Sequence, residues 1–244
     1  KALSSTICPA EAPVMKIYPF SFQDRTAYII ACFASTNGTN YDPDRPYRTD
    51  YNNLVNNPDN EPTLSIITQQ LADISEREGL DQKQLLGLAI AFVQSMPYSL
   101  DNESTPYNDY PNFPYETVYA NTGDCKDKAM LLAALLQKMG YDVVILRPPG
   151  HSALGLACNP DDFEYEGLTM TFVQFLYGRN SSNFHYNLSA FPYDGKNYCY
   201  LETTAIGSMI GERPEHITDQ NVQIAPIRPI NESAPGLSIK ESYK

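Results

Sequence analysis

Three side chains in the second half of the chain have the chemistry of a nucleophile, a base and an acid. Cys125 stands where a helix is expected to begin, and a thiolate at a helix N-terminus is stabilised by the helix dipole and by free N–H groups. His151 is expected to open a strand, and Glu202 to lie on a later strand. A histidine beside the thiol can accept its proton and return it to a leaving group, and a carboxylate can fix the tautomer of the imidazole. We therefore predict a Cys-His-Glu triad that attacks an amide carbonyl through Cys125.

Apolar periodicity predicts the elements that must position these groups. Helices are expected over 63–78, with Thr63 as N-cap, over 82–95, where Asp81 and Gln84 form a capping-box pattern, and from about 124 to 139. Strands are expected at 141–146, 151–158 and 197–203, and two adjacent strands can present His151 and Glu202 toward one helix terminus. Because the helices precede the strands, the predicted fold class is α+β.

The predicted domain organisation has a central catalytic unit with a segment on either side. Residues 1–62 are expected to form an irregular extension packed on the core, with one strand-like stretch at 28–33. Residues 63–212 form the catalytic domain, with a loop at 98–121 and an insert at about 160–195. Residues 213–244 form an extended tail that is rich in proline.

The segment Thr122-Gly123-Asp124-Cys125-Lys126-Asp127-Lys128-Ala129 closely resembles the transglutaminase-like superfamily, where a G-D-C-x-D segment begins the helix that carries the nucleophile. Residues 149–155 are similar to the histidine strand of that family, and residues 200–204 to its acid strand. The usual acid there is Asp, so Glu202 is a departure. The resemblance covers roughly residues 85–212 and implies a papain-like core, in which the nucleophile at a helix start packs on an antiparallel sheet.

Further residues are candidates for the surroundings of the nucleophile. The backbone N–H of Cys125 is a natural oxyanion donor. Gln94 is the candidate for the second donor, because it follows the buried helix and precedes the nucleophile as the oxyanion glutamine does in papain-like folds; the alternative is an ordinary glutamine at a helix end. Tyr98 and Tyr119 either line the substrate cleft or fill the interface with the first helices.

Charged residues flank the nucleophile on both sides. Asp124 and Asp127 lie in the expected first turn of the helix, where we interpret both as caps of free N–H groups. Lys126 and Lys128 either favour the thiolate or face solvent. Asp194 is a rival for the triad acid, but Asp194-Gly195 is typical of a turn. An acidic stretch at 161–166 is interpreted as a solvated loop rather than a calcium site.

Composition narrows the class of protein. With 29 acidic and 17 basic residues the net charge is −12, which argues against nucleic acid and anionic membranes as partners. The longest apolar run, at 85–93, is too short to span a bilayer, so no membrane insertion is expected. Five cysteines without a CxxC pair and three histidines without HExxH support no metal site.

The odd number of cysteines fits one working thiol and up to two disulfides. The remaining four, Cys8, Cys32, Cys158 and Cys199, allow three pairings that the sequence leaves open. Together with five N-x-S/T sequons, this composition favours an extracytoplasmic or cell-surface location. The sequons are Asn37, Asn102, Asn180, Asn187 and Asn231.

The expected activity is acyl transfer on peptide or isopeptide amides through a thioester, with no cofactor. Water as the acceptor makes the protein a cysteine peptidase or amidase, which we favour, and an amine makes it a transglutaminase that crosslinks proteins. The partner in either case is a peptide or protein substrate. The alternative from another class is a non-catalytic peptide-binding domain that keeps the fold.

Overall fold

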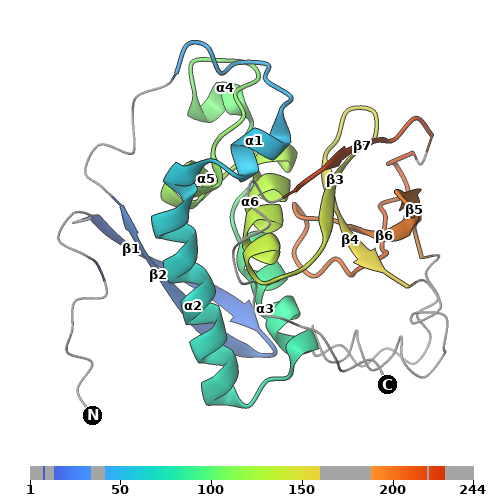
Figure 1. The fold of residues 1–244 in the computed structure, drawn as a ribbon. Helices are drawn as coiled ribbons and strands as arrows, with labels where there is room; N and C mark the ends of the chain where they lie inside the picture. The colour runs from blue at the N-terminus through green and yellow to red at the C-terminus, as the bar shows by residue number, and fades with distance from the viewer. Residues whose placement is uncertain (1–7, 9–13, 34–41, 160–187, 219, 229–244) are drawn as a thin grey trace.

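The computed structural model describes residue 8 and residues 14–33, 42–159, 188–218 and 220–228. The protein is α+β: a layer of helices lies between a β-hairpin and an antiparallel sheet (Figure 1). In the hairpin, β1 (Val14–Phe22) pairs with β2 (Arg25–Phe33). Helices α2 (Glu61–Glu78) and α3 (Gln82–Gln94) pack against it.

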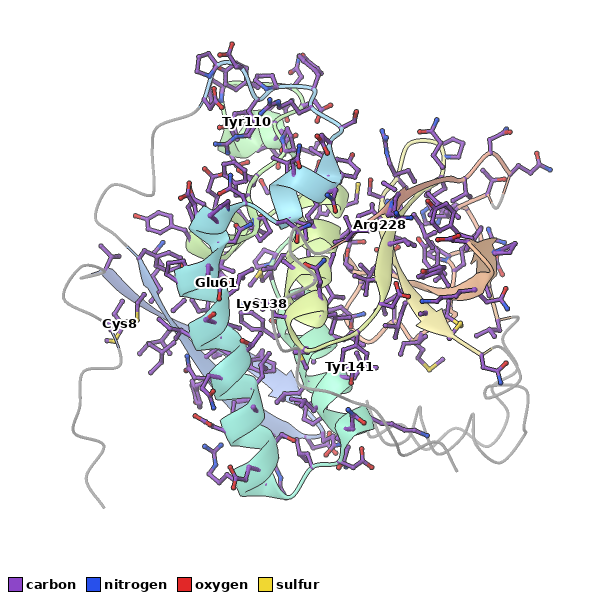
Figure 2. The ribbon with its side chains drawn as sticks, in the orientation of Figure 1. Cys8, Glu61, Tyr110, Lys138, Tyr141 and Arg228 are labelled. Atoms are coloured by element: carbon purple, nitrogen blue, oxygen red, sulfur yellow. A yellow bond between two sulfur atoms is a disulfide. The ribbon has the colours of Figure 1, made fainter. Side chains whose placement is uncertain are left out.

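The central helix is α6 (Cys125–Lys138), which packs against other helices on one side and against the antiparallel sheet on the other. Its residues from Lys126 to Leu136 are all buried, since α3 and α5 (Pro114–Ala120) cover one side and the sheet covers the other. At its last turn, the Lys138 ammonium lies 2.7 Å from the carboxylate of Glu61 at the start of α2 (Figure 2). A helix buried on all sides can fix its first residue firmly relative to the sheet.

The sheet has five strands in the order β5-β6-β4-β3-β7, and every neighbouring pair is antiparallel. Strand β3 leaves the end of α6 and runs back along it, so the chain returns to the end of α6 where Cys125 lies. The side chains of β3 alternate, with Val143 and Ile145 in the main core and Val144 and Leu146 in a second apolar cluster. The strands are β3 (Val143–Arg147), β4 (Ala153–Cys158), β5 (Ala190–Tyr193), β6 (Lys196–Leu201) and β7 (Gln223–Pro226).

The expectation of an irregular segment over residues 1–62 is wrong for its described part. The hairpin, α1 (Tyr51–Val55) and η1 (Pro58–Asn60) occupy it. Strand β1 alternates between more buried and exposed side chains along its whole length, and Pro19 occupies one of the exposed positions of this edge strand, where proline is tolerated. Its turn uses Gln23 and Asp24 with φ angles of 48° and 59° rather than the usual glycine.

Other boundaries differ from the expectations in smaller ways. Helix α2 begins before Thr63, because Pro62 is favourable in a first turn. The expected loop at 98–121 contains α5 and a short α4 (Asp101–Ser104). Strand β5 lies in the expected insert and β7 in the expected tail. The rest of the insert, at 160–187 with its acidic stretch, and the tail at 229–244 lie outside the described residues.

The five cysteines form two disulfides and leave one free thiol, as their odd number predicts. Cys8 bonds to Cys32, and Cys158 bonds to Cys199, whereas Cys125 is free and partly exposed. The second disulfide joins β4 to β6, which are the strands next to His151 and Glu202. Within the described ranges, none of the helices has the length and apolar character that crossing a bilayer requires.

Candidate active site

Cys125 is the first residue of α6, and the preceding turn is built around two acidic residues. Asp124 is the N-cap, and its Oδ1 accepts hydrogen bonds from the N–H groups of Lys126 and Asp127 at 2.9 and 3.1 Å. The N–H of Cys125 has no acceptor within the helix. A Cβ on Gly123 would lie 2.8 Å from the Cβ of Asp127, so this turn requires glycine. The G-D-C-x-D spacing therefore has a steric and a capping reason.

His151 reaches the site from a turn rather than from a strand. Its N–H donates to the carbonyl of Pro148 at 3.1 Å, and Gly150 has a φ of 73°. Strand β4 begins two positions later, at Ala153. The prediction that His151 opens the strand is therefore wrong, because the residue lies in the turn before it. The two prolines at 148 and 149 explain the difference, because they stop the strand pairing before the histidine.

Glu202 follows the last residue of β6, and both oxygens of its carboxylate are engaged in hydrogen bonds. Oε2 lies 2.8 Å from Nε2 of His151 and accepts from the Tyr200 hydroxyl at 2.9 Å. Oε1 accepts from the N–H groups of Thr203 and Thr204 at 2.9 and 2.8 Å and from the Thr204 hydroxyl at 2.7 Å. Glu202 is 2 % exposed. Its position and its charge are therefore fixed by hydrogen bonds.

The electrostatics of these residues favour a charged pair. Burial disfavours the carboxylate of Glu202, but its hydrogen bonds with His151 and Thr204 outweigh burial and lower its pKa to about 2. Burial likewise disfavours the His151 imidazolium, but hydrogen bonds with Cys125 and Glu202 and the charge of Glu202 raise its pKa to about 10. Since Nε2 faces Glu202, the other ring nitrogen, Nδ1, faces the thiol. The arrangement therefore holds a charged imidazolium between the Glu202 carboxylate and the Cys125 thiol.

Lys126 and Lys128 do not face solvent. The Lys126 ammonium lies 2.5, 2.6 and 3.1 Å from carboxylate oxygens of Asp101, Asp124 and Asp109. Burial disfavours its charge, but the charges of Asp127 and Asp124 and the hydrogen bonds to Asp101 and Asp124 raise its pKa. Lys128 is completely buried and donates to two carbonyls at the end of α3, those of Gln94 and Met96, and its burial lowers its pKa to about 8. Both ammonium groups are engaged in holding the site together.

Asp127 also has a structural task, but it is not a cap of its own helix. Its carboxylate accepts from the N–H and the Nδ2 of Asn112 at 2.9 and 2.7 Å, and so ties the preceding loop to α6. One carboxylate oxygen each of Asp101, Asp124 and Asp127 lie within 4.8 Å of one another. The Lys126 ammonium bonds to the first two of these residues and already supplies positive charge there.

A cleft of about 550 Å³ lies between the start of α6, the end of β3 and the start of β7. Cys125 and His151 lie on its wall, with the Lys126 cluster beside them. Arg147, the last residue of β3, and Gln223 of β7 also line it. A space of this size and polarity can accept a short stretch of peptide.

The assignment of Gln94 to the oxyanion hole is wrong. Its Nε2 donates to the carbonyls of Glu202 and Ser208 at 2.8 and 3.0 Å, and its Oε1 accepts from the N–H of Gly207 at 3.0 Å. Both amide hydrogens are used, so none remains for an oxyanion. Gln94 instead clamps the loop that follows Glu202 onto α3.

The two tyrosines proposed for the cleft have different positions. Burial raises the pKa of the Tyr98 phenol, and the charges of the nearby Cys125 and Asp124 raise it further. It pairs with Gly123 in a short parallel bridge and borders the nucleophile outside the lining of the main cleft. Tyr119 packs edge-on against Phe33 of the hairpin. Tyr119 thus fills an interface with the hairpin, where the Lys16 ammonium also lies over its ring, rather than the expected interface with the first helices.

Several residues of the site were not predicted from the sequence. Tyr200 and Thr204 lie two positions before and after the acid, which is a spacing that could have identified its hydrogen-bond donors. Asp101 and Arg147 come from an apparent loop and from a strand end, where no pattern distinguishes them. Asp194 lies in the turn between β5 and β6 with a φ of 49°, and is not the acid of the triad.

Comparison with known proteins adds no relationship to this geometry. The chain matches no protein-family model. A search of curated proteins also finds no match.

Proposed function

We propose that this protein is a cysteine enzyme of the transglutaminase-like superfamily with a papain-like core, and that it hydrolyses peptide or isopeptide amides. The observation that carries this proposal is the position of His151, which hydrogen-bonds the free thiol of Cys125 and the buried carboxylate of Glu202. A histidine held between a thiol and a carboxylate is the arrangement that nucleophilic catalysis needs. The non-catalytic alternative gives no reason for the five hydrogen bonds that orient Glu202.

The reaction follows from the atoms in the cleft. The Cys125 thiolate attacks the amide carbon, and the charge that develops on the carbonyl oxygen is stabilised by the Cys125 N–H. His151 Nδ1 donates its proton to the amide nitrogen, the C–N bond breaks, and a thioester remains on Cys125. Water then attacks the thioester, His151 takes its proton, and the C–S bond breaks to release the acid and restore the thiolate.

Water is the acceptor we favour, because Cys125 is partly exposed and lies on the wall of a polar cleft. An amine in place of water would give a transglutaminase through the same thioester. The two disulfides fit an oxidising compartment, so we propose an extracytoplasmic location.

The acceptor can be tested with a mixture of peptides in water enriched in oxygen-18 and containing a fluorescent primary amine. Hydrolysis places oxygen-18 in one new carboxyl group of a product peptide, whereas transamidation places the amine there. Cys125→Ser is the matched control, because it keeps the size of the side chain and removes the thiol. Neither product above this control, with peptide binding retained, would support the binding-domain alternative.

A further inference from the structure

Arg147 is a cation in the cleft that has no acidic partner among the residues the structure describes. It is partly buried and lines the same cleft as Cys125 and His151. No carboxylate in the described ranges lies within ion-pair distance of its guanidinium. The other two basic side chains of the cleft wall are paired: Lys126 is surrounded by three carboxylates, and His151 pairs with Glu202. A partly buried charge that is left unpaired costs free energy, which a ligand of opposite charge can recover.

The fold holds this guanidinium in a defined place. Arg147 continues the alternation of Val143 and Ile145 along β3 and therefore lies on the face of the sheet that packs on α6. Its guanidinium carbon lies 5.1 Å from the centre of the Tyr51 ring. Tyr51 is itself buried and hydrogen-bonded to Ser152.

Stacking of this kind leaves the hydrogen-bonding edge of a guanidinium free. Arginine can rest its planar face on an aromatic ring while its N–H fork binds a carboxylate with two parallel hydrogen bonds. The neighbouring side chain on β7, Gln223, is paired in register with Arg147 and adds a neutral amide to the same wall. The described surroundings of Arg147 thus offer donors for an anion, and they contain no carboxylate that pairs with it.

We propose that Arg147 binds a carboxylate of the peptide substrate and so determines which amide is presented to Cys125. This inference rests on the proposed function, since it assigns the substrate class of the same cleft. The carboxylate is either the side chain of an acidic residue near the scissile amide or the C-terminal carboxylate of the substrate. A chain with a net charge of −12 needs such a local cation to hold an anionic substrate.

The first test compares electrophiles that react with Cys125, so it requires no known substrate. The probes are 3-maleimidopropionate and 6-maleimidohexanoate, each beside its neutral methyl ester, and the readout is the ratio of the rate constants for acid and ester. For at least one of the two probe pairs, the ratio of the acid's rate constant to the ester's should be about tenfold higher in the wild type than in Arg147→Gln. Arg147→Lys keeps the charge without the fork and should be intermediate.

Arg25→Gln removes an equal charge at the exposed hairpin turn and is the matched control. The proposal is overturned if the ratio is the same in Arg147→Gln as in the wild type, or if Arg25→Gln lowers it as much. Failure of the proposed function looks different, because the neutral esters would then react with Cys125 no faster than with a small free thiol.

A second test separates the two sources of the carboxylate through protection of Cys125 from a neutral maleimide. The protecting peptides are acetyl-Ala-Ala-Ala with a free C-terminus, acetyl-Ala-Glu-Ala-amide and the neutral acetyl-Ala-Ala-Ala-amide. Better protection by the first peptide identifies a C-terminal carboxylate, and better protection by the second identifies an acidic side chain. The advantage must disappear in Arg147→Gln, and equal protection by all three peptides would contradict the proposal.

Discussion

Oε2 of Glu202 lies 2.8 Å from Nε2 of His151, although the resemblance on which the site was predicted has the shorter Asp in this position. The extra methylene is accommodated because Glu202 stands one residue beyond the end of β6, where the N–H groups of Thr203 and Thr204 hold its other oxygen. The length of the Glu202 side chain thus fits the loop that follows β6. Its length and its charge should both matter.

Substitution of Glu202 should separate these two properties. Glu202→Gln keeps the length and removes the charge that stabilises the imidazolium, so kcat/KM should fall by about a hundredfold or more. Glu202→Asp keeps the charge and should lose the bond to His151, since the Thr203 and Thr204 N–H groups hold the other carboxylate oxygen in the loop and the shorter side chain cannot span both partners. Steady-state kinetics with a peptide that the oxygen-18 experiment finds to be cleaved would measure both. Full activity in Glu202→Gln would contradict a role for the carboxylate.

The charged pair should also make stability depend on pH. The pKa of Glu202 is lowered to about 2, so its stabilisation is present above its ordinary pKa of 4.5 and is lost as the pH falls toward 2. The pKa of His151 is raised to about 10, so its stabilisation is complete below its ordinary pKa of 6.5 and is lost as the pH rises through 10.

The free energy of unfolding of the wild type should therefore exceed that of Glu202→Gln most between pH 4.5 and 6.5, and the excess should shrink in acid and in alkali. Urea titrations of both proteins at pH 3, 5.5 and 10 would measure it. A difference that is constant over this range would contradict the charged pair.

Gly123 should be needed for the position of the nucleophile. In Gly123→Ala the new Cβ meets the Cβ of Asp127 at 2.8 Å, so α6 must shift at its first turn, at a cost of about 1–3 kcal/mol. The rate of alkylation of Cys125 should change as well. Gly79→Ala is the control, because its φ of 66° makes alanine unfavourable at a helix end that lies away from the cleft. It should lower stability and leave the alkylation rate unchanged.

Gln94 should behave as a structural clamp. Gln94→Glu replaces the donor to the carbonyls of Glu202 and Ser208 by an acceptor, so the free energy of unfolding should fall by at least about 2 kcal/mol. Chemical denaturation measures this loss. An oxyanion donor would give the opposite pattern, with stability kept and kcat reduced.

The three long helices were predictable because their signals are local, whereas the short helices α1, α4 and α5 were not. The capping box of Asp81 and Gln84 and the start of α6 at Cys125 depend on neighbours within a few residues. The hairpin was not predictable in full, because Pro19 and a turn without glycine conceal β1. Strand β7 is short and is defined by its pairing with β3, which is a partner distant in sequence.

In the site, too, local features were predictable from the sequence and contacts between distant segments were not. Cys125, His151 and Glu202 were predictable from residue type and order, and the structure brings them together. The hydrogen bonds of Gln94 to the loop after Glu202, and the placing of the Arg147 guanidinium beside Tyr51 in the cleft, arise from contacts between distant segments. No spacing in the sequence records such contacts.

The central claim is that Cys125 is a nucleophile activated by His151, and the pH dependence of its alkylation tests this most directly. Because the other cysteines are in disulfides, limiting iodoacetamide should label Cys125 alone, and peptide mass spectrometry can verify this. We predict rapid labelling already at pH about 5–6, lost in His151→Ala. Labelling that rises only near pH 8.5, as for an ordinary free thiol, and that is unchanged in His151→Ala would contradict the account.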